Sequence, residues 1–302
     1  MADPYIFVKR SPTSSHGECD TIVHDARSAP AKHHGNRGCK QSIIERFRRE
    51  SNDIIVLTYV DDCIILAQDK GTITKFISTL RLGPENFDFI DEGTLDKYLG
   101  LEVRRQSKGF PMSQPFLIER IITAANIDAR MTNPKATPAV EPLLGGDENG
   151  PERKQGWNYR QLIGMLGYLQ HTTRPDIAMA THQCARFSAS NPKLLYERGV
   201  KRICKYLLNS MDKGIIFQPD LSRGLECHVD ADFAGGWATC DQSKPESVLS
   251  RAGYMISCAG CPIQWCSKIE SEIALSTTEA EYITMSMAMR DVLPFLNLMS
   301  EL

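Results

Sequence analysis

The sequence predicts a chain of mixed class, in which α+β and α/β units follow one another. Three observations indicate this class: paired β-branched runs within residues 54–67, apolar residues at helical spacing through residues 158–209, and short strand patterns followed by a helix within residues 213–302. Short apolar runs are typical of strands, and an apolar period near 3.6 residues is typical of helices. With 302 residues and 42% hydrophobic content, the chain is long enough for two modest domains.

The first paired runs flank Tyr59-Val60-Asp61-Asp62 and predict a tight β-hairpin. Ile54–Leu57 precede this tetrad, and Cys63–Ala67 follow it. Two β-branched runs joined through a short polar segment are typical of a hairpin, so Asp61 and Asp62 are expected together at its tip. Carboxylate oxygens suit a hard divalent ion such as Mg²⁺. The alternative is an ordinary solvated Asp-Asp turn.

A helix, a second hairpin and another helix are expected next. Apolar residues at helical spacing over 73–80 predict an amphipathic helix. Segments 98–104 and 110–112 lie on either side of Gly109 and predict a hairpin, and residues 116–125 predict a helix. The Pro- and Gly-rich stretch 131–157 then predicts a linker.

The second half of the chain changes from helices to strands. Three helices are expected at about 158–171, 175–188 and 192–209, the second opened by Pro175 with Asp176 beside it. Strand patterns follow at 214–217, 225–229, 252–258 and 263–266, and a long helix begins at about Thr278. Strands followed by a helix predict an α/β unit.

Two carboxylates of this last region are candidate site residues. Alternation places Leu225, Cys227 and Val229 inward and ends the strand at Asp230, while Glu281 is expected in the first turn of the helix. A nuclease that uses two metals needs carboxylates that converge from a strand and a helix. The alternative for Glu281 is a capping box.

Two registers of that capping box are open. Thr278-x-x-Glu281 would use Glu281 to satisfy backbone N–H groups, and Ser276-x-x-Glu279 offers the same arrangement earlier in the chain. One sequence does not fix the register. Glu279 and Glu281 therefore both remain candidates for the cap and for the catalytic glutamate.

Several ordered motifs together resemble the polymerase polyprotein (Pol) of copia-type LTR retrotransposons. The similarity extends over about residues 51–302 and includes a short segment at 2–9 that resembles the strand before the hairpin. The motifs are Tyr59-Val60-Asp61-Asp62, Asn86-Phe87-Asp88-Phe89 through residues 97–103, Tyr159–Gly164, Thr173–Ala178 and Leu275–Tyr282.

The resemblance implies an order of modules. Residues 1–50 correspond to a partial palm strand with a disordered insertion, and 51–130 to the reverse transcriptase palm. Residues 131–157 are then the linker and 158–212 a helical connection. Residues 213–302 correspond to an RNase H-like domain that is truncated at its C-terminus.

The resemblance also implies activity, cofactors and partners. The parent activity is RNA-directed DNA polymerase, a nucleotidyl transfer, with RNase H cleavage of RNA–DNA hybrids. Asp61 and Asp62 would hold metal for polymerisation, and Asp230 and Glu281 would hold it for cleavage, with Glu279 as the cap. The cofactor is Mg²⁺, with Mn²⁺ as the alternative. The partners are RNA template, DNA primer, RNA–DNA hybrid and dNTPs.

Two departures from the family pattern limit this expectation. The family's palm uses a further aspartate well upstream of the hairpin, and its RNase H site uses another aspartate after the long helix; neither is in the sequence. Each 1.36 kcal/mol of lost transition-state stabilisation costs about tenfold in rate, so at most residual activity is expected. The alternative function is a non-catalytic remnant that binds nucleic acid or a partner.

Composition bears on partners and compartment. Lys and Arg number 35 against 37 Asp and Glu, a net charge of −2, whereas nucleic-acid binders usually carry a basic footprint; a local basic stripe is then needed. No run approaches the roughly 18 apolar residues of a membrane span, so no membrane anchoring is expected. Cys63, Cys184, Cys204 and Cys227 are expected as reduced core thiols, in a cytoplasmic protein that the resemblance associates with virus-like particles.

Overall fold

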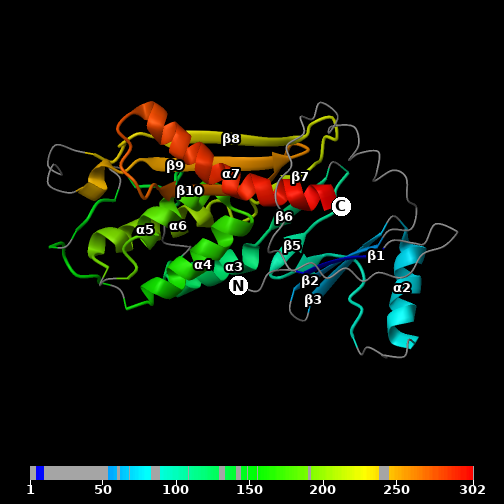
Figure 1. Cartoon of the computed structure of the whole chain (residues 1–302). Helices are drawn as coiled ribbons and strands as arrows, with labels where there is room; N and C mark the ends of the chain where they lie inside the picture. The colour runs from blue at the N-terminus through cyan, green and yellow to red at the C-terminus, as the bar shows by residue number, and fades with distance from the viewer. Residues whose placement is uncertain are drawn as a thin grey trace. The chain divides into compact units, whose positions relative to one another are not determined.

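The structure, a computed structural model, has a mixed α+β architecture, which confirms the predicted class (Figure 1). Contacts divide the chain into two compact units, one of Met1–Leu95 with Asn297–Leu302 and one of Asp96–Leu296. The described residues are 5–9, 54–59, 62–67, 69–82, 89–107, 109–128, 133–140, 144–147, 149–154, 156–189, 192–237 and 245–301.

The first unit contains the predicted hairpin. Strands β2 (Ile54–Tyr59) and β3 (Asp62–Ala67) pair antiparallel, with Tyr59 opposite Asp62 at the closed end. Strand β1 (Tyr5–Lys9) pairs with β2 on its other side, so the sheet order is β1-β2-β3. Helix α2 (Lys70–Leu82) follows. The early strand, the hairpin and the amphipathic helix were all predicted from the sequence, and all three are confirmed.

A helical core dominates the second unit. Four helices build it: α3 (Pro115–Ala124), α4 (Tyr159–Thr172), α5 (Ala178–Ala185) and α6 (Leu194–Leu208), with a short 3-10 turn η1 (Pro175–Ile177) before α5. Each fully buried aliphatic side chain contributes roughly 1.5 to 3 kcal/mol. The most buried are Ile118, Ile121, Leu162, Leu166, Leu169, Ile177, Val200, Ile203 and Leu207.

The compact units do not divide at the predicted linker, residues 131–157. Leu144 from that stretch is buried in the helical core, and Ile121 of α3 packs into the same core as Leu166 of α4. Helix α3 therefore shares one core with the helices that follow. The module limits implied by the resemblance remain predictions, because a division by contacts does not test them.

Two antiparallel sheets complete the second unit. The first has the order β4-β5-β6-β7 and contains the second predicted hairpin; its strands are β4 (Lys97–Tyr98), β5 (Leu101–Val103), β6 (Phe110–Ser113) and β7 (Ile215–Phe217). The other has the order β10-β9-β8, with β8 (Leu225–Asp232), β9 (Arg251–Cys258) and β10 (Cys261–Ile269). Strand β7 thus joins a hairpin about a hundred residues earlier in the chain.

Helix α7 (Thr277–Glu301) lies along the sheet of β8, β9 and β10 (Figure 1). The Tyr254 hydroxyl donates to Asp291 of α7 at 2.5 Å, and the Thr284 hydroxyl donates to Glu270 at 2.9 Å. The Trp265 indole N–H donates to the Gln170 carbonyl of α4 at 2.7 Å. These buried or half-buried polar contacts fix the sheet between α7 and the helical core.

Two expectations about β8 were wrong. The strand does not end at Asp230 but continues through Asp232, because Asp232 still pairs with Arg251 of β9. Cys227 is exposed rather than inward. Strand β8 is an outer strand of the described sheet, where polar residues can continue the ladder, and Cys227 is exposed although Leu225 and Val229 on the same face are half-buried.

The cysteines separate into exposed and buried thiols. Cys63 is exposed, as is Cys227, which contradicts the expectation that both are core residues. Cys184 and Cys204 are buried as predicted, and burial raises the pKa of each thiol to about 12. The thiolate is the reactive form. The two buried thiols are therefore protected from alkylation both because reagents cannot reach them and because they stay protonated.

Iodoacetamide at pH 8 is therefore expected to alkylate Cys63 and Cys227 in the folded chain and to leave Cys184 and Cys204 unmodified. Peptide mapping by mass spectrometry, with and without denaturant, measures this. The denatured sample is the control, in which all four sites react. Equal modification of all four sites without denaturant would contradict the described burial.

Candidate functional site

The hairpin of the first unit presents one described carboxylate at its tip. Asp62 is exposed and opens β3 directly opposite Tyr59. Asp61 lies outside the described residues. The half-buried Val56 and Ile65, which pair across the hairpin, hold the two strands on either side of the turn. An exposed carboxylate has the oxygen donors that Mg²⁺ accepts, so Asp62 at the first position of β3 could contribute one ligand to a divalent ion.

Asp230 lies in the exposed outer strand β8, opposite Gly253 of β9. Cross-strand partners share one face of a sheet, so Asp230 is on the same face as Gly253 and Arg251. The next residue of β9, Tyr254, is on the other face, where its hydroxyl meets α7. Asp230 and helix α7 are therefore on opposite faces of this sheet.

The start of α7 decides between the two capping registers. The Glu279 N–H donates to the Ser276 hydroxyl at 3.1 Å, and the Leu275 N–H donates to the Glu279 carboxylate at 2.7 Å. Glu279 is the acidic residue of the first turn. The cap thus uses Ser276 and Glu279, which confirms Glu279 as the cap residue. Glu281 lies beyond the first turn, which corrects its expected position, and is exposed.

Glu270 is a buried carboxylate that the sequence did not single out. Its side chain is 1% exposed at the end of β10, where Oε1 accepts from Thr284 and Oε2 has no hydrogen-bond partner among the described residues. Burial raises the pKa of Glu270, the Thr284 hydroxyl lowers it, and the nearby Glu281 carboxylate raises it further. Glu281 is thus close enough to Glu270 for their charges to interact.

The charge of Glu270 is expected to oppose folding at neutral pH. An acid whose pKa is raised in the folded state binds its proton more tightly there than in the unfolded chain, so stability falls as the pH rises above about 4.5 through the folded-state pKa. Glu270→Gln is expected to raise the free energy of unfolding at pH 7 by about 1 kcal/mol. The same substitution should also reduce the difference between the free energies of unfolding at pH 5 and at pH 7.

Urea unfolding followed by circular dichroism at both pH values measures the effect. The matched control is Glu272→Gln, which changes the same charge at an exposed position two residues away. A loss of stability in Glu270→Gln at pH 7 would show that the Glu270 carboxylate stabilises the fold as a charge.

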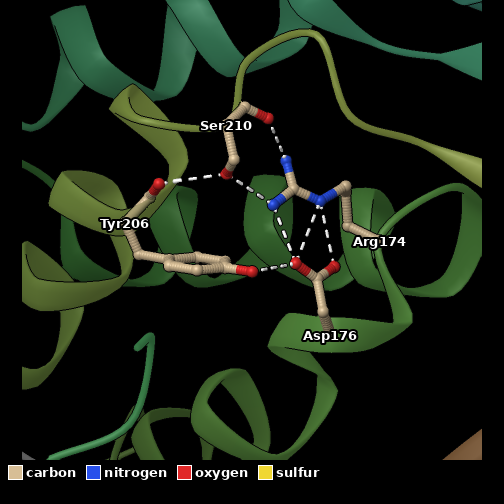
Figure 2. Close-up of polar contacts among 4 residues, drawn as sticks. All are labelled: Arg174, Asp176, Tyr206 and Ser210. Atoms are coloured by element: carbon tan, nitrogen blue, oxygen red, sulfur yellow. Dashed lines mark hydrogen bonds and ion pairs between the residues drawn. The ribbon is translucent and has the colours of Figure 1, made fainter. Parts of the chain in front are cut away.

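The Thr173–Ala178 motif contains a buried polar network (Figure 2). Arg174 is 1% exposed; its Nε and Nη2 donate to the two oxygens of Asp176 at 2.9 and 2.8 Å, and its Nη1 donates to the Ser210 carbonyl at 2.7 Å. The Tyr206 hydroxyl also donates to Asp176, at 2.6 Å. This network ties the turn before α5 to the C-terminal end of α6, so its function is structural.

Burial alone would raise the pKa of Asp176, but the hydrogen bonds from Arg174 and Tyr206 hold it below its usual range. Burial and the bond to Asp176 raise the pKa of Tyr206. The aspartate is therefore charged and the tyrosine protonated at neutral pH. The Thr173–Ala178 motif therefore contains an ion pair in which Arg174 and Asp176 neutralise each other's charge.

The described residues contain no group of three or more His, Cys, Asp and Glu side chains that could hold a metal ion. Asp62, Asp230 and Glu281 are each exposed, and none of the described contacts joins them. None of the helices in the described ranges is long and apolar enough to cross a membrane. Within the second unit, Asp230 and Glu281 are therefore separate positions among the described residues.

Comparison with known proteins gives the class of the chain. Residues 32–141, which include the hairpin of β2 and β3, match the family described as reverse transcriptase (RNA-dependent DNA polymerase). The chain is 34% identical over 248 residues, 78% of its length, to the retrovirus-related Pol polyprotein from transposon TNT 1-94 of Nicotiana tabacum. It is 27% identical over 255 residues, 84% of its length, to the corresponding polyprotein from transposon RE1 of Arabidopsis thaliana.

A shorter relative matches over much of its own length as well. The putative transposon Ty5-1 protein YCL074W of Saccharomyces cerevisiae is 25% identical over 249 residues, which are 82% of this chain and 76% of that protein. The chain spans 17% of the tobacco polyprotein and 16% of the RE1 polyprotein. It carries a reverse transcriptase family segment, and it belongs to the copia-type retrotransposon Pol family.

Proposed function

We propose that this chain is the part of a copia-type Pol polyprotein that carries the metal-binding hairpin of an RNA-directed DNA polymerase. The observation that supports this most directly is the β2–β3 hairpin, which lies inside the segment that matches the reverse transcriptase family and exposes Asp62 at its tip. Asp61 and Asp62 bind Mg²⁺, or Mn²⁺ as an alternative. Asp61 and Asp62 would hold the ions, whose chemistry when bound would be to activate the attacking primer oxygen and to stabilise the leaving group in nucleotidyl transfer.

The protein's own contribution is to position these ligands. Paired strands on both sides of the turn fix the Asp62 backbone, so little freedom is lost when an ion binds. Template RNA, DNA primer and dNTPs are the substrates of the parent activity. Their phosphates would bring negative charge next to the two aspartates, which is why Asp61 and Asp62 would need a bound cation there.

The test is Mn²⁺ binding followed by electron paramagnetic resonance, together with primer extension on poly(rA) with oligo(dT) in Mg²⁺ and in Mn²⁺. Asp61→Asn with Asp62→Asn is expected to lower the amount of Mn²⁺ bound per chain and to remove any extension. The control pair is Glu92→Gln with Glu119→Gln, which removes two exposed carboxylates elsewhere. Unchanged Mn²⁺ binding in the hairpin variant would refute the site.

A second candidate activity is cleavage of RNA in an RNA–DNA hybrid, with Asp230 and Glu281 as metal ligands. It is supported by the chain order of strands followed by a helix, by the exposure of both carboxylates, and by the use of Glu279 rather than Glu281 in the cap. This candidate rests on the chemistry of the two carboxylates and on the order of the elements along the chain. The register of β8 does not support it, because Asp230 is not on the face that contacts α7.

This second candidate predicts that Asp230→Asn and Glu281→Gln each lower the cleavage of a labelled hybrid, whereas Glu279→Gln lowers stability without removing cleavage. Cleavage that is insensitive to Asp230→Asn and Glu281→Gln would exclude these ligands. A folded chain that neither binds primer–template nor shows metal-dependent activity would favour the alternative of a non-catalytic remnant.

A further inference from the structure

Four basic side chains gather where helix α5 meets strands β9 and β10. His182 and Arg186 come from α5 and its C-terminal end, Arg251 is the first residue of β9, and Lys268 is near the end of β10. We refer to these four residues as the basic cluster. Arg186 and Lys268 are exposed, and His182 is half-buried.

Arg251 is the buried member of the cluster. Its side chain is 8% exposed, and its Nε has no hydrogen-bond partner among the described residues. The guanidinium Nη1 donates to His182 Nδ1 at 3.4 Å and to the Ser267 hydroxyl at 3.3 Å, and Nη2 donates to the Gln183 side-chain oxygen at 3.1 Å. Two of these contacts are longer than an ordinary hydrogen bond, and all three acceptors are neutral.

The cluster has more positive than negative charge. Burial, and then the charges of Arg251, Arg186 and Lys268, lower the pKa of His182 to about 4, so His182 is neutral at pH 7. Burial, and then Arg186, lower the pKa of Arg251 to about 10, while Asp232 on the adjacent strand acts in the opposite direction. Three cations therefore face one carboxylate in a half-buried setting. Buried charges without close partners are costly, and an anion would relieve this cost.

We propose that the basic cluster binds a backbone phosphate of the nucleic acid on which this chain acts. Exposed Arg186 and Lys268 supply the donors and the charge that a phosphate can reach, and the buried guanidinium of Arg251 adds positive charge beneath them. Arg is well matched to phosphate because its planar fork can donate two parallel hydrogen bonds. The neutral His182, with Nδ1 accepting from Arg251, carries its proton on Nε2 and adds a further donor.

The position of the basic cluster relates phosphate binding to Asp230. Arg251 pairs with Asp232, and Asp230 lies two residues along the same face of β8. A phosphate held at Arg251 would therefore bring the nucleic-acid backbone along the face that carries Asp230. This inference rests on the proposed function, because it takes its ligand class from the parent polymerase and nuclease activities.

The test measures binding of a fluorescein-labelled RNA–DNA hybrid to the purified full chain by fluorescence anisotropy at several salt concentrations. Arg186→Gln with Lys268→Gln is expected to weaken binding at least tenfold at low salt. It should also reduce the slope of log affinity against log salt by about 1 or more. The control pair is Arg198→Gln with Arg290→Gln, which lowers the net charge equally at exposed positions on α6 and α7. Circular dichroism checks that all variants fold.

The outcomes distinguish a failure of the proposed phosphate site from a failure of the proposed function of the chain. A loss confined to the Arg186 and Lys268 pair supports the phosphate site. Equal losses in both pairs, or no loss in either, would overturn the site while leaving the proposed function in place. A wild-type chain that is folded and does not bind the hybrid would overturn the proposed function and, with it, the assignment of a nucleic-acid phosphate as the ligand.

Discussion

Replacing Arg174 with Met is expected to lower the free energy of unfolding by about 3 kcal/mol, because the buried guanidinium makes charge-assisted hydrogen bonds to Asp176 and to Ser210 that would all be lost. The substitution keeps most of the apolar stem and deletes the guanidinium. Asp176 then loses its cation, and the Ser210 carbonyl loses a donor at 2.7 Å. The end of α6 would no longer be tied to the turn before α5.

The Arg174 variant should also change how stability depends on pH. The pKa of Asp176 is lowered in the folded chain, so its stabilisation is present above the ordinary value of 3.8 and is lost as the pH falls through the folded-state pKa. Arg174→Met removes most of this acid-dependent part. Urea unfolding at pH 7 and at pH 3.5 measures both effects.

The matched control for this prediction is Arg198→Met, which makes the same chemical change at an exposed position on α6. It should alter stability by less than about 0.5 kcal/mol. If the two variants lost stability equally, the network in Figure 2 would contribute nothing specific.

Gly214→Ala is expected to be as destabilising, by about 3 kcal/mol, because the added methyl group has no space. A Cβ at Gly214 would lie 1.9 Å from the Met112 carbonyl oxygen and 2.9 Å from its carbon. Both are backbone atoms of β6 and cannot rotate away. The pairing of Met112 with Ile215 would have to separate, and buried Ile215 would lose its contacts with Ala178 and Trp265.

Gly164→Ala is the control for the Gly214 variant. Gly164 is exposed within α4, and a Cβ there meets nothing within 4 Å. Ala is favoured over Gly in a helix by about 1 kcal/mol, so this variant should gain stability. The opposite signs of the two substitutions, measured by urea unfolding, test the described approach of β6 to β7. A neutral Gly214→Ala variant would contradict it.

Local patterns allowed much of the fold to be predicted. The hairpin around Asp62 and the helix over 73–80 each depend on neighbouring residues, and both are present, whereas the helix expected over 175–188 begins as the 3-10 turn η1 and its α-helical part, α5, is shorter than predicted. The end of β8 was mistaken because Asp230 was taken as a stop. In an outer strand, polar residues are tolerated and the ladder continues to Asp232.

Long-range features could not be predicted in the same way. The burial of Glu270 depends on Thr284, fourteen residues later in the chain. The basic cluster is assembled from α5, β9 and β10, so no single sequence window shows it, and the net charge of −2 conceals it. The compact unit that starts at Asp96 depends on strand β7, which returns to β6 from a distant segment.

The outer position of β8 has a consequence for the solution behaviour of the protein. An outer strand offers backbone groups to which another extended chain could add, which is a common route to aggregation. In β8, one side of the strand carries Glu226, His228, Asp230 and Asp232 in alternation. A second copy that docked edge to edge would place carboxylates against carboxylates, so repulsion between like charges opposes such docking.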